Sequence, residues 1–579
     1  MTTFRLLPLS GCALMILLGT TALILDGCDG TKATAVRQDS LVVGDPTQAS
    51  ALPDALAKAY AQGARDITIA PGDYQLPATG RSTFLLENWR DVVIRAEGAT
   101  LTFAELRKPP VLLRRCTRVI WEGGTLRYAR PAATQGRITA RGSDAAGAFL
   151  DWKIDFGYPT GIDPLKSTFD VVNPETRELR PDTGDFFAKA AEALAPGHWR
   201  LRQLKGGMGA AVVGDVVFTR DPSGGSHLFH LDRSARCAVR SVTLQNAGFA
   251  AVFETGGDGD HHYADCRFIP GPRPTDAKDD QLVSCGADGF HSSGTRTGPT
   301  IERCHWTGVL HDDCIAIHGA LEDVVRSEGR LLIMPKGGRV PFTVGEPVRL
   351  NHQNGFYAEA LCTGLRILDQ EDNLRELALD RELSVPAGTK AGNPRRNGAG
   401  FRIVDCVLGG ARSRGILVKA DDGLIQGNTI TGCGMSAISI GPEYWWNEAD
   451  YSHRVVVRDN ILVGNVRNGS DAGALFIHGD GSPGNLDLTV TGNTWRENFG
   501  PIALHAEDIL GLTLLGNTFT LPGEPLASGK PRIVLSLRRA SGVILTDNIV
   551  DAPPGPPLIR LGPGVDPLTP TQEAGLRRR

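Results

Sequence analysis

Short apolar stretches separated by polar, glycine-containing turns recur along most of this chain. Val92–Ile94 and Val119–Trp121 are two of them. Runs of this length that are rich in β-branched and aromatic residues are typical of short strands. Glycine accounts for 70 of the 579 residues, well above its usual share, which fits a chain with many turns. The pattern predicts an all-β protein.

One phrase recurs eight times, with cysteine at its second position in the first three copies and asparagine in the other five. The residues at that position are Cys266, Cys304, Cys406, Asn428, Asn460, Asn493, Asn517 and Asn548. Repeats about 22 to 24 residues apart match one coil of a solenoid built from three short strands. Identical residues stacked one strand apart can pack, and asparagines can hydrogen-bond in a ladder. A sandwich with similar hairpins gives no reason for this alignment, so we predict a right-handed parallel β-helix, an all-β fold.

The ends and the interruptions of the rhythm suggest further parts. Residues 50–62 form an amphipathic pattern that predicts a helix covering the open end of the solenoid. Residues 139–222 and 320–399 break the coil rhythm and are interpreted as two inserted small β-barrel-like modules, the first with a helix-like patch from Asp185 to Leu194. The predicted organisation is a signal segment at 1–28, coils at 39–138, 223–319 and 400–552 around these modules, and a Pro/Gly-rich tail at 553–579.

Charge and cysteine content narrow the class. The net charge is only −4 with both signs interspersed, so the footprint of a nucleic-acid-binding protein is absent. An apolar run from Cys12 to Leu25 after Arg5 is typical of an export signal, so we expect an exported protein, periplasmic, surface-anchored or extracellular, with Cys28 as a candidate lipid anchor. Most of the 11 cysteines fall in strand-like segments, which favours small buried side chains over disulfides.

Three aspartates stand out in the central coils. Asp288 and Asp312 are about one coil apart, and Asp313 follows directly, so we expect three carboxylates to converge on one small surface. Like charges at this range raise at least one pKa. Carboxylates in unequal protonation states are what glycosidic-bond hydrolysis requires, and the cluster therefore predicts a carbohydrate-active hydrolase. Asp312 and Asp313 could both reach a cleft only from a strand end or a bend, because neighbours on a strand point to opposite faces.

The sequence around these aspartates resembles that of a known family. Ala287-Asp288-Gly289 and, one coil later, Asp312-Asp313 followed by Ile317-His318-Gly319 resemble exo-acting α-1,3-galactosidases of glycoside hydrolase family 110. Pro442-Glu443-Tyr444-Trp445-Trp446-Asn447-Glu448 is similar to a later stretch of that family. The similarity to polygalacturonases is more distant, because their Asn-Thr-Asp and Gly-His-Gly motifs are missing here.

The resemblance implies an inverting, metal-free reaction without a cofactor on a terminal α-galactoside. Asp312 would be the general acid, and Asp288 and Asp313 would hold and deprotonate the attacking water. The candidate substrate-binding residues are Glu254, His291, His318, Arg414, Lys419, Glu443, Trp445, Trp446 and Glu448.

Purely structural roles are alternatives for these candidate residues. The histidines could simply stack on consecutive coils, the tryptophans could pack in the core, and Arg414 and Lys419 could be ordinary solvated cations or could bind a carboxylate or sulfate. Two other function classes also remain: a uronate lyase or epimerase using bound calcium, and a non-catalytic carbohydrate-binding β-helix.

Overall fold

The computed structural model describes residues 41–579, apart from 132, 209, 221–224, 369–372, 483, 524–525, 527–528 and 554–557. The predicted signal segment and Cys28 lie outside these residues. Ser40–Arg579 form one compact unit. No helix among the described residues combines the length and hydropathy that a membrane span requires. Strands dominate, and the α-helices described are α1 (Leu52–Ala61) and α2 (Pro570–Ala574).

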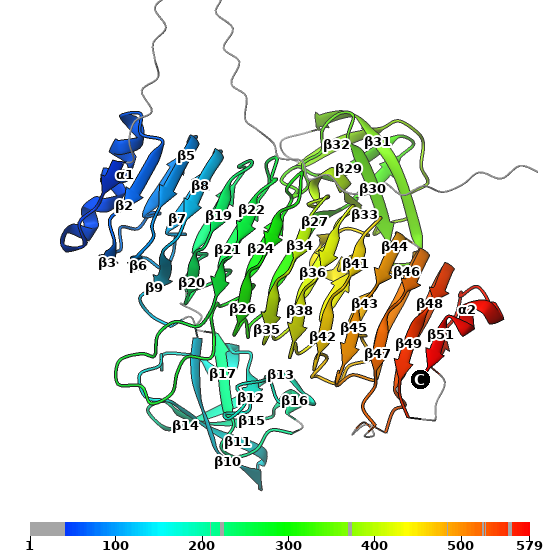
Figure 1. The fold of residues 1–579 in the computed structure, drawn as a ribbon. Helices are drawn as coiled ribbons and strands as arrows, with labels where there is room; N and C mark the ends of the chain where they lie inside the picture. The colour runs from blue at the N-terminus through cyan, green and yellow to red at the C-terminus, as the bar shows by residue number, and fades with distance from the viewer. Residues whose placement is uncertain are drawn as a thin grey trace, which may run out of the picture. The chain divides into compact units, whose positions relative to one another are not determined.

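Most strands belong to three ladders in which each strand pairs in parallel with its equivalent in the next coil (Figure 1). The first ladder consists of β4 (Phe84–Glu87), β7 (Val111–Arg114), β18 (Phe229–Asp232), β21 (Val252–Thr255), β24 (Phe290–Ser293), β27 (Ile315–Asp323), β36 (Ile416–Lys419), β39 (Ile438–Ile440), β43 (Leu475–Ile477), β46 (Ile502–Leu515), β48 (Ile533–Thr546) and β50 (Ile559–Leu561).

The second and third ladders complete each coil. The second contains β1 (Leu41–Val43), β2 (Asp66–Ile69), β5 (Arg90–Arg95), β8 (Thr117–Glu122), β19 (Ala238–Arg240), β22 (His262–Ala264), β25 (Thr300–Glu302), β34 (Arg402–Val404), β37 (Leu424–Gln426), β41 (Val456–Arg458) and β44 (Asn485–Thr491). The third contains β3 (Gly72–Leu76), β6 (Ala99–Phe103), β9 (Thr125–Tyr128), β20 (Thr243–Gln245), β23 (Arg267–Phe268), β26 (His305–Thr307), β35 (Val407–Gly409), β38 (Thr429–Thr431), β42 (Ile461–Val463), β45 (Thr494–Arg496), β47 (Thr518–Thr520), β49 (Asn548–Asp551) and β51 (Leu576–Arg578).

Inward-facing apolar side chains of successive coils form one continuous core. In the first ladder Phe290, Ile315, Ile416 and Ile438 stack in register and are fully buried. Parallel strands fed by short turns bury such residues coil after coil. The prediction of a nearly all-β chain with large parallel sheets is confirmed, whereas the handedness of the coils, the capping role of α1 and the module boundaries stay predictions.

The predicted asparagine ladder is confirmed. The side-chain amide of each residue donates to the Oδ1 atom of the next, from Asn428 through Asn460, Asn493 and Asn517 to Asn548, over 2.8–3.1 Å. Each Oδ1 also accepts the backbone N–H of the preceding asparagine. All five are buried, so the ladder satisfies polar groups that water cannot reach. The nine described cysteines are likewise buried and free, as predicted.

Two groups of antiparallel strands interrupt the coils. The first contains β10 (Ala133–Asp144), β11 (Gly147–Ile154), β12 (Asp170–Val172), β14 (Ala190–Ala195), β15 (His198–Arg202) and β17 (Val216–Arg220), with the pair β13 (Thr183–Phe187) and β16 (Lys205–Met208). The second contains β28 (Arg326–Glu328), β29 (Leu331–Pro335), β30 (Pro347–His352), β31 (Phe356–Ile367), β32 (Leu374–Leu379) and β33 (Lys390–Gly392), which pairs with the end of β27. Each group has its own buried apolar cluster.

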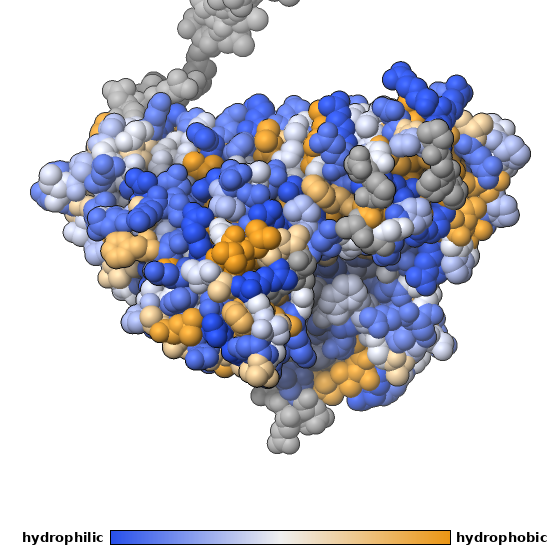
Figure 2. All heavy atoms as spheres, turned by 90° about the horizontal axis from the view of Figure 1, so that it is seen from below, coloured by the Kyte–Doolittle hydropathy of each residue, from blue (hydrophilic) through white to orange (hydrophobic). Residues whose placement is uncertain are grey.

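Two local predictions are wrong. The helix-like patch from Asp185 to Leu194 forms parts of β13 and β14, because pairing of β14 with β15 overrides the helix propensity of its alanines. The end of the chain is not a tail, since β51 pairs in parallel with β49 and extends the third ladder. In the view of Figure 2 the surface is mostly hydrophilic, with apolar residues in small separate groups, as is usual for exposed apolar side chains.

We expect Asn493→Ala to lower the free energy of unfolding by about 3 kcal/mol, because a buried donor or acceptor left unsatisfied costs about 1–3 kcal/mol. Asn493 accepts from Asn460 and donates to Val457 O and Asn517. Urea unfolding of the two proteins measures the difference. Asn354→Ala, in an exposed turn, is the matched control and should change the value by less than about 1 kcal/mol. Equal unfolding of Asn493→Ala and wild type would show that the ladder does not stabilise the coils.

Candidate active site

The three aspartates lie in the turns that lead into β24 and β27. Phe290 pairs with Ile315, an offset of 25 residues, so Asp288 stands beside Asp313 and not beside Asp312. The backbone N–H of Asp313 donates to Asp288 Oδ1 over 3.3 Å. Asp312 and Asp313 occupy a bend before the first residue of β27, which is how both neighbours reach the same side. One carboxylate oxygen from each of the three residues lies within 4.8 Å of the others, as expected from the sequence.

A cavity of about 620 Å³ opens over this cluster. It is lined by Asp185, Phe187, Asp288, His291, Asp312, Asp313, Ala316, Arg412, Ser413, Arg414, Leu417, Met435, Glu443, Trp445, Trp446 and Glu448. These residues come from four consecutive coils of the first ladder and from β13. The cavity therefore gathers the three aspartates and six of the nine predicted binding residues.

Asp313 is the most firmly held of the three aspartates. The coil that follows places Arg414 beside it, so that the backbone N–H of Arg414 donates to Asp313 Oδ1 over 2.6 Å and its guanidinium lies 3.4 Å from Oδ2. Burial raises the pKa of Asp313 to about 6, Arg414 opposes this shift, and Asp288 adds to it. The side chain is thus fixed in place and titrates near neutrality.

Asp312 is the exposed member. Its side chain is 40% exposed, and its one close cation is Arg412, whose Nη2 atom lies 3.5 Å from Oδ1. Loss of hydration in the cavity and the neighbouring carboxylates of Asp288 and Asp313 raise the pKa of Asp312 well above its usual range, although Arg412 and Arg414 oppose them. The carboxyl that faces the cavity therefore binds a proton more tightly than a free aspartate does.

Two histidines hold Asp288 through a chain of hydrogen bonds. His318 Nδ1 lies 2.5 Å from the carbonyl oxygen of Gly319, to which it donates, and burial lowers the pKa of His318 to about 4. The neutral ring leaves Nε2 as an acceptor for His291 Nε2–H over 2.8 Å, and His291 Nδ1 lies 2.7 Å from Asp288 Oδ2. Burial lowers the pKa of His291, but Asp288 more than offsets this, so the pKa is raised overall. The hydrogen-bonded chain thus runs from Gly319 O through His318 and His291 to Asp288 and holds that carboxylate in place.

Glu443 and Glu448 share one buried cation. Lys419 is fully buried at the end of β36 and donates to Glu443 over 3.0 Å and to Glu448 over 2.5 Å, and Arg414 also donates to Glu443. Burial raises the pKa of both glutamates, but the cations outweigh it and the net shift is downward. Both are therefore carboxylates that can accept hydrogen bonds from sugar hydroxyls where they meet the cavity.

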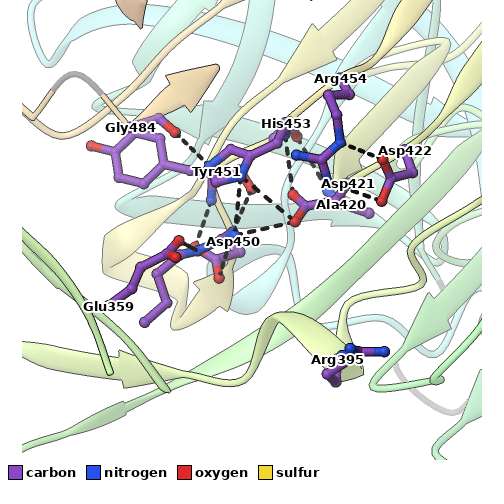
Figure 3. Close-up of polar contacts among 12 residues, drawn as sticks. Glu359, Arg395, Ala420, Asp421, Asp422, Asp450, Tyr451, His453, Arg454 and Gly484 are labelled. Atoms are coloured by element: carbon purple, nitrogen blue, oxygen red, sulfur yellow. Dashed lines mark hydrogen bonds and ion pairs between the residues drawn. The ribbon is translucent and has the colours of Figure 1, made fainter. Parts of the chain in front are cut away.

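The segment after Glu448 is anchored from the second antiparallel group. Arg349 of β30 donates to Tyr451 O and forms ion pairs with Asp421 and Asp450, around which His453 and Glu359 also gather (Figure 3). Arg349, Asp421 and Asp450 are all buried. One guanidinium with several acceptors holds this segment in place.

Trp445 and Trp446 form the exposed edge of the cavity. They lie in the short 3-10 helix η4 (Tyr444–Trp446) and are 66% and 65% exposed. The prediction that they line the site rather than fill the core agrees with this placement. Large rings with one open face are suited to stacking on the C–H face of a sugar.

Three predicted binding residues lie elsewhere. The prediction that Glu254 reaches the cleft is wrong, because its side chain faces the solenoid interior. There it accepts a hydrogen bond from Tyr263 over 2.7 Å, and burial raises its pKa to about 7. The prediction that Lys419 contacts the substrate is also wrong, because its ammonium group is buried against Glu443 and Glu448. His318 lines a neighbouring cavity of about 480 Å³. No sequence signal pointed to Asp185, Phe187 or Arg412. Asp185 and Phe187 reach the cavity because β13 folds back to the coils.

The three clustered aspartates are also the group of described residues whose ligand atoms could surround a metal ion. Among the described residues, the three carboxylates would favour a bound cation, whereas the neighbouring Arg412 and Arg414 would repel it.

We expect Lys419→Met to lower the free energy of unfolding at pH 7 by about 3 kcal/mol, because it leaves two carboxylates in a buried site without their cation. Glu448 has a lowered pKa in the folded chain, so its stabilising effect is complete above about pH 4.3 and is lost as the pH falls further. The difference from wild type should therefore shrink below that pH. Denaturant unfolding at pH 7 and pH 3.5 measures it, with the exposed Lys58→Met as control. A difference that grows towards acid would contradict the assignment.

Comparisons with known proteins show a distant resemblance. No protein-family model matches the chain. It is 25% identical over 412 residues to Alpha-1,3-galactosidase B of Bacteroides thetaiotaomicron, covering 65% of this chain and 63% of that protein. It is 23% identical over 447 residues to Alpha-1,3-galactosidase B of Akkermansia muciniphila, covering 72% of this chain and 54% of that protein. The chain thus spans less than two thirds of the length of these relatives.

Among solved structures, the chain is similar to the mannuronan C-5 epimerase AlgE6 A-module of Azotobacter vinelandii, with a TM-score of 0.39 and 11% identity, covering 89% of this chain and 97% of that one. It is also similar to the catalytic unit of the GH87 alpha-1,3-glucanase of Streptomyces thermodiastaticus, with a TM-score of 0.40 and 11% identity, covering 92% and 69%. Scores below 0.5 establish neither a common fold nor a function.

Proposed function

We propose that this chain is a glycoside hydrolase that releases terminal α-1,3-linked galactose from glycans, with inversion at the anomeric carbon. The observation that carries the proposal is the position of Asp312: its carboxyl opens to a 620 Å³ cavity beside the carboxylates of Asp288 and Asp313, which are held in place, and its pKa is raised. The names of the two curated relatives support galactose and the α-1,3 linkage, and the resemblance supports inversion.

In the proposed reaction Asp312 donates its proton to the glycosidic oxygen as the bond to the anomeric carbon breaks. Asp288 and Asp313 orient a water molecule, and one of them takes its proton as the oxygen attacks. Their roles follow from their contacts, since His291 holds Asp288 and Arg414 holds Asp313. Glu448 accepts hydrogen bonds from sugar hydroxyls, while Trp445 and Trp446 stack on the ring.

The spacing of the carboxylates calls for a direct test of stereochemistry. Inverting enzymes with two carboxylates usually hold them about 6.5–9.5 Å apart to leave room for water. Here the nearest oxygens lie within 4.8 Å. Proton NMR during hydrolysis should show β-galactose as the first product if inversion occurs, and α-galactose as the first product would overturn that part of the proposal.

We expect Asp312→Asn to reduce kcat/KM on α-1,3-galactosides by about 10³-fold, within the range that general acid catalysis contributes. The measurement is release of galactose from a panel of α-galactosides, with galacturonan and a calcium-supplemented lyase assay in parallel. Asp276→Asn, an exposed aspartate in a left-handed turn, is the matched control and should retain wild-type activity. Unsaturated products formed with calcium would favour a lyase. Glycan binding without turnover by wild type would favour a binding protein.

Asp185→Asn should move the alkaline limb of the pH–rate profile down by about 1 pH unit. Asp185 accepts two hydrogen bonds from Arg412, at 2.7 and 2.8 Å, and so occupies the cation that faces Asp312. Without this partner Arg412 would stabilise the ionised form of Asp312, lower its pKa and remove the acid at lower pH. Initial rates from pH 4 to 9 measure the limb, with the exposed Asp182→Asn in the same segment as control. An unshifted limb would show that Asp185 does not govern the acid.

A further inference from the structure

A second cavity of about 480 Å³ adjoins the sugar pocket and shares His291 and Glu448 with it. Its other walls come from β21, β24 and the second antiparallel group. The side chains that bring polar or charged atoms to it include Thr255, Ser293, Asn393, Asn447, Arg339 and Arg396. None of these residues is used by the proposed reaction, and the volume exceeds what a few ordered waters need.

Arg396 is the least satisfied cation at this cavity. It lies at the end of the 3-10 helix η3 (Pro394–Arg396), and its side chain is only 18% exposed. Its nearest acceptors are distant: Gly257 O at 3.4 Å and Glu346 Oε1 at 3.7 Å. Its Nε atom is buried without a hydrogen-bond partner among the described residues. A buried guanidinium with open donors is costly unless an acceptor arrives.

Among the described residues, the carboxylate that forms an ion pair with Arg396 is Glu346, and it already has other partners. Arg296 donates to Glu346 Oε1 over 2.6 Å, and the Asn393 amide donates to Oε2 over 2.8 Å. Burial raises the pKa of Glu346, but these partners and Arg396 lower it overall, so it carries a single negative charge against two guanidiniums. Asp258, 3.8 Å from Arg296, is largely exposed and well screened.

The remaining charged groups leave the cavity positive. Arg339 is exposed and forms no ion pair with any described residue. Glu448, on the shared wall, is paired with Lys419 over 2.5 Å. His318 is neutral at pH 7, and the charge of His291 is matched by Asp288. Arg339 and Arg396 therefore line the same cavity, and the described carboxylates do not provide a separate partner for each of them.

We propose that the 480 Å³ cavity is an anion-binding subsite that takes the carboxylate or sulfate ester of an acidic sugar next to the galactosyl unit. This inference rests on the proposed function, because it assumes a glycan in the adjoining pocket. The planar guanidinium matches the paired oxygens of both anions, and such charge-assisted bonds are the strong ones. The substrate class is then an acidic glycan.

Isothermal titration in an Asp312→Asn background tests the subsite without turnover. The probes are length-matched α-galactosyl oligosaccharides in which the neighbouring sugar is neutral, carboxylated or sulfated. We expect the acidic probes to bind about tenfold more tightly than the neutral one at low salt, with the advantage falling as ionic strength rises. The stronger of the two acidic arms identifies the anion.

Arg339→Gln and Arg396→Gln should each remove the difference in affinity between the acidic and the neutral probes. Arg395→Gln is the matched control, because Arg395 is an exposed neighbour in η3 that lines neither cavity and stands apart from the Asp421–Asp450 ion pairs (Figure 3). Thermal unfolding verifies the fold, and the exposed Arg339 variant decides the matter if the Arg396 variant does not fold.

Equal affinity for neutral and acidic probes, or an acidic advantage that survives in Arg339→Gln, would overturn the subsite. Failure of the proposed function has a different signature: the wild-type chain would release no galactose from any probe, while the titrations would still report the acidic preference or its absence.

Discussion

The register between coils is the constraint on which the site depends. Each strand of the first ladder pairs with its equivalent in the next coil, so a residue before one strand meets the residue before the next at the spacing of one strand pair. That offset sets Asp288 against Asp313 and Asp313 against Arg414. A shift of one residue would turn each side chain to the other face and separate the acids from their partners.

The electrostatics of the site follow from this stacking. Two consecutive coils carry the acids and the next coil carries Arg412 and Arg414, so each carboxylate has a different set of neighbours. Asp313 has Arg414, Asp288 has the His291–His318 pair, and Asp312 has an arginine already engaged by Asp185. Three identical residues thereby acquire different surroundings, which is the asymmetry that general acid–base chemistry requires.

Much of this arrangement could be predicted from the sequence, because it is periodic. The asparagine ladder, the buried cysteines and the convergence of three aspartates all follow from residues that recur at one-coil spacing. The role of Lys419 could not be predicted, since nothing in Arg414–Lys419 indicates that the ammonium turns inward. Asp185 could not be predicted either, because an antiparallel strand far from the coils in sequence has no period that links it to them. Its alanine-rich continuation even suggested a helix, and strand pairing decided otherwise.

The order of residues along the chain has a consequence for biosynthesis. The acids Asp288, Asp312 and Asp313 emerge from the ribosome about a hundred residues before Arg412, Arg414 and Lys419, and the second antiparallel group lies between them. A solenoid that grows from its N-terminus therefore exposes the three aspartates on its two newest coils before the coil with Arg412 and Arg414 stacks upon them. At that stage His291 already lies beside Asp288, whereas Asp313 lacks the Arg414 contacts that hold it. Addition of the coil that carries Arg414 is therefore the step that completes the contacts of Asp313.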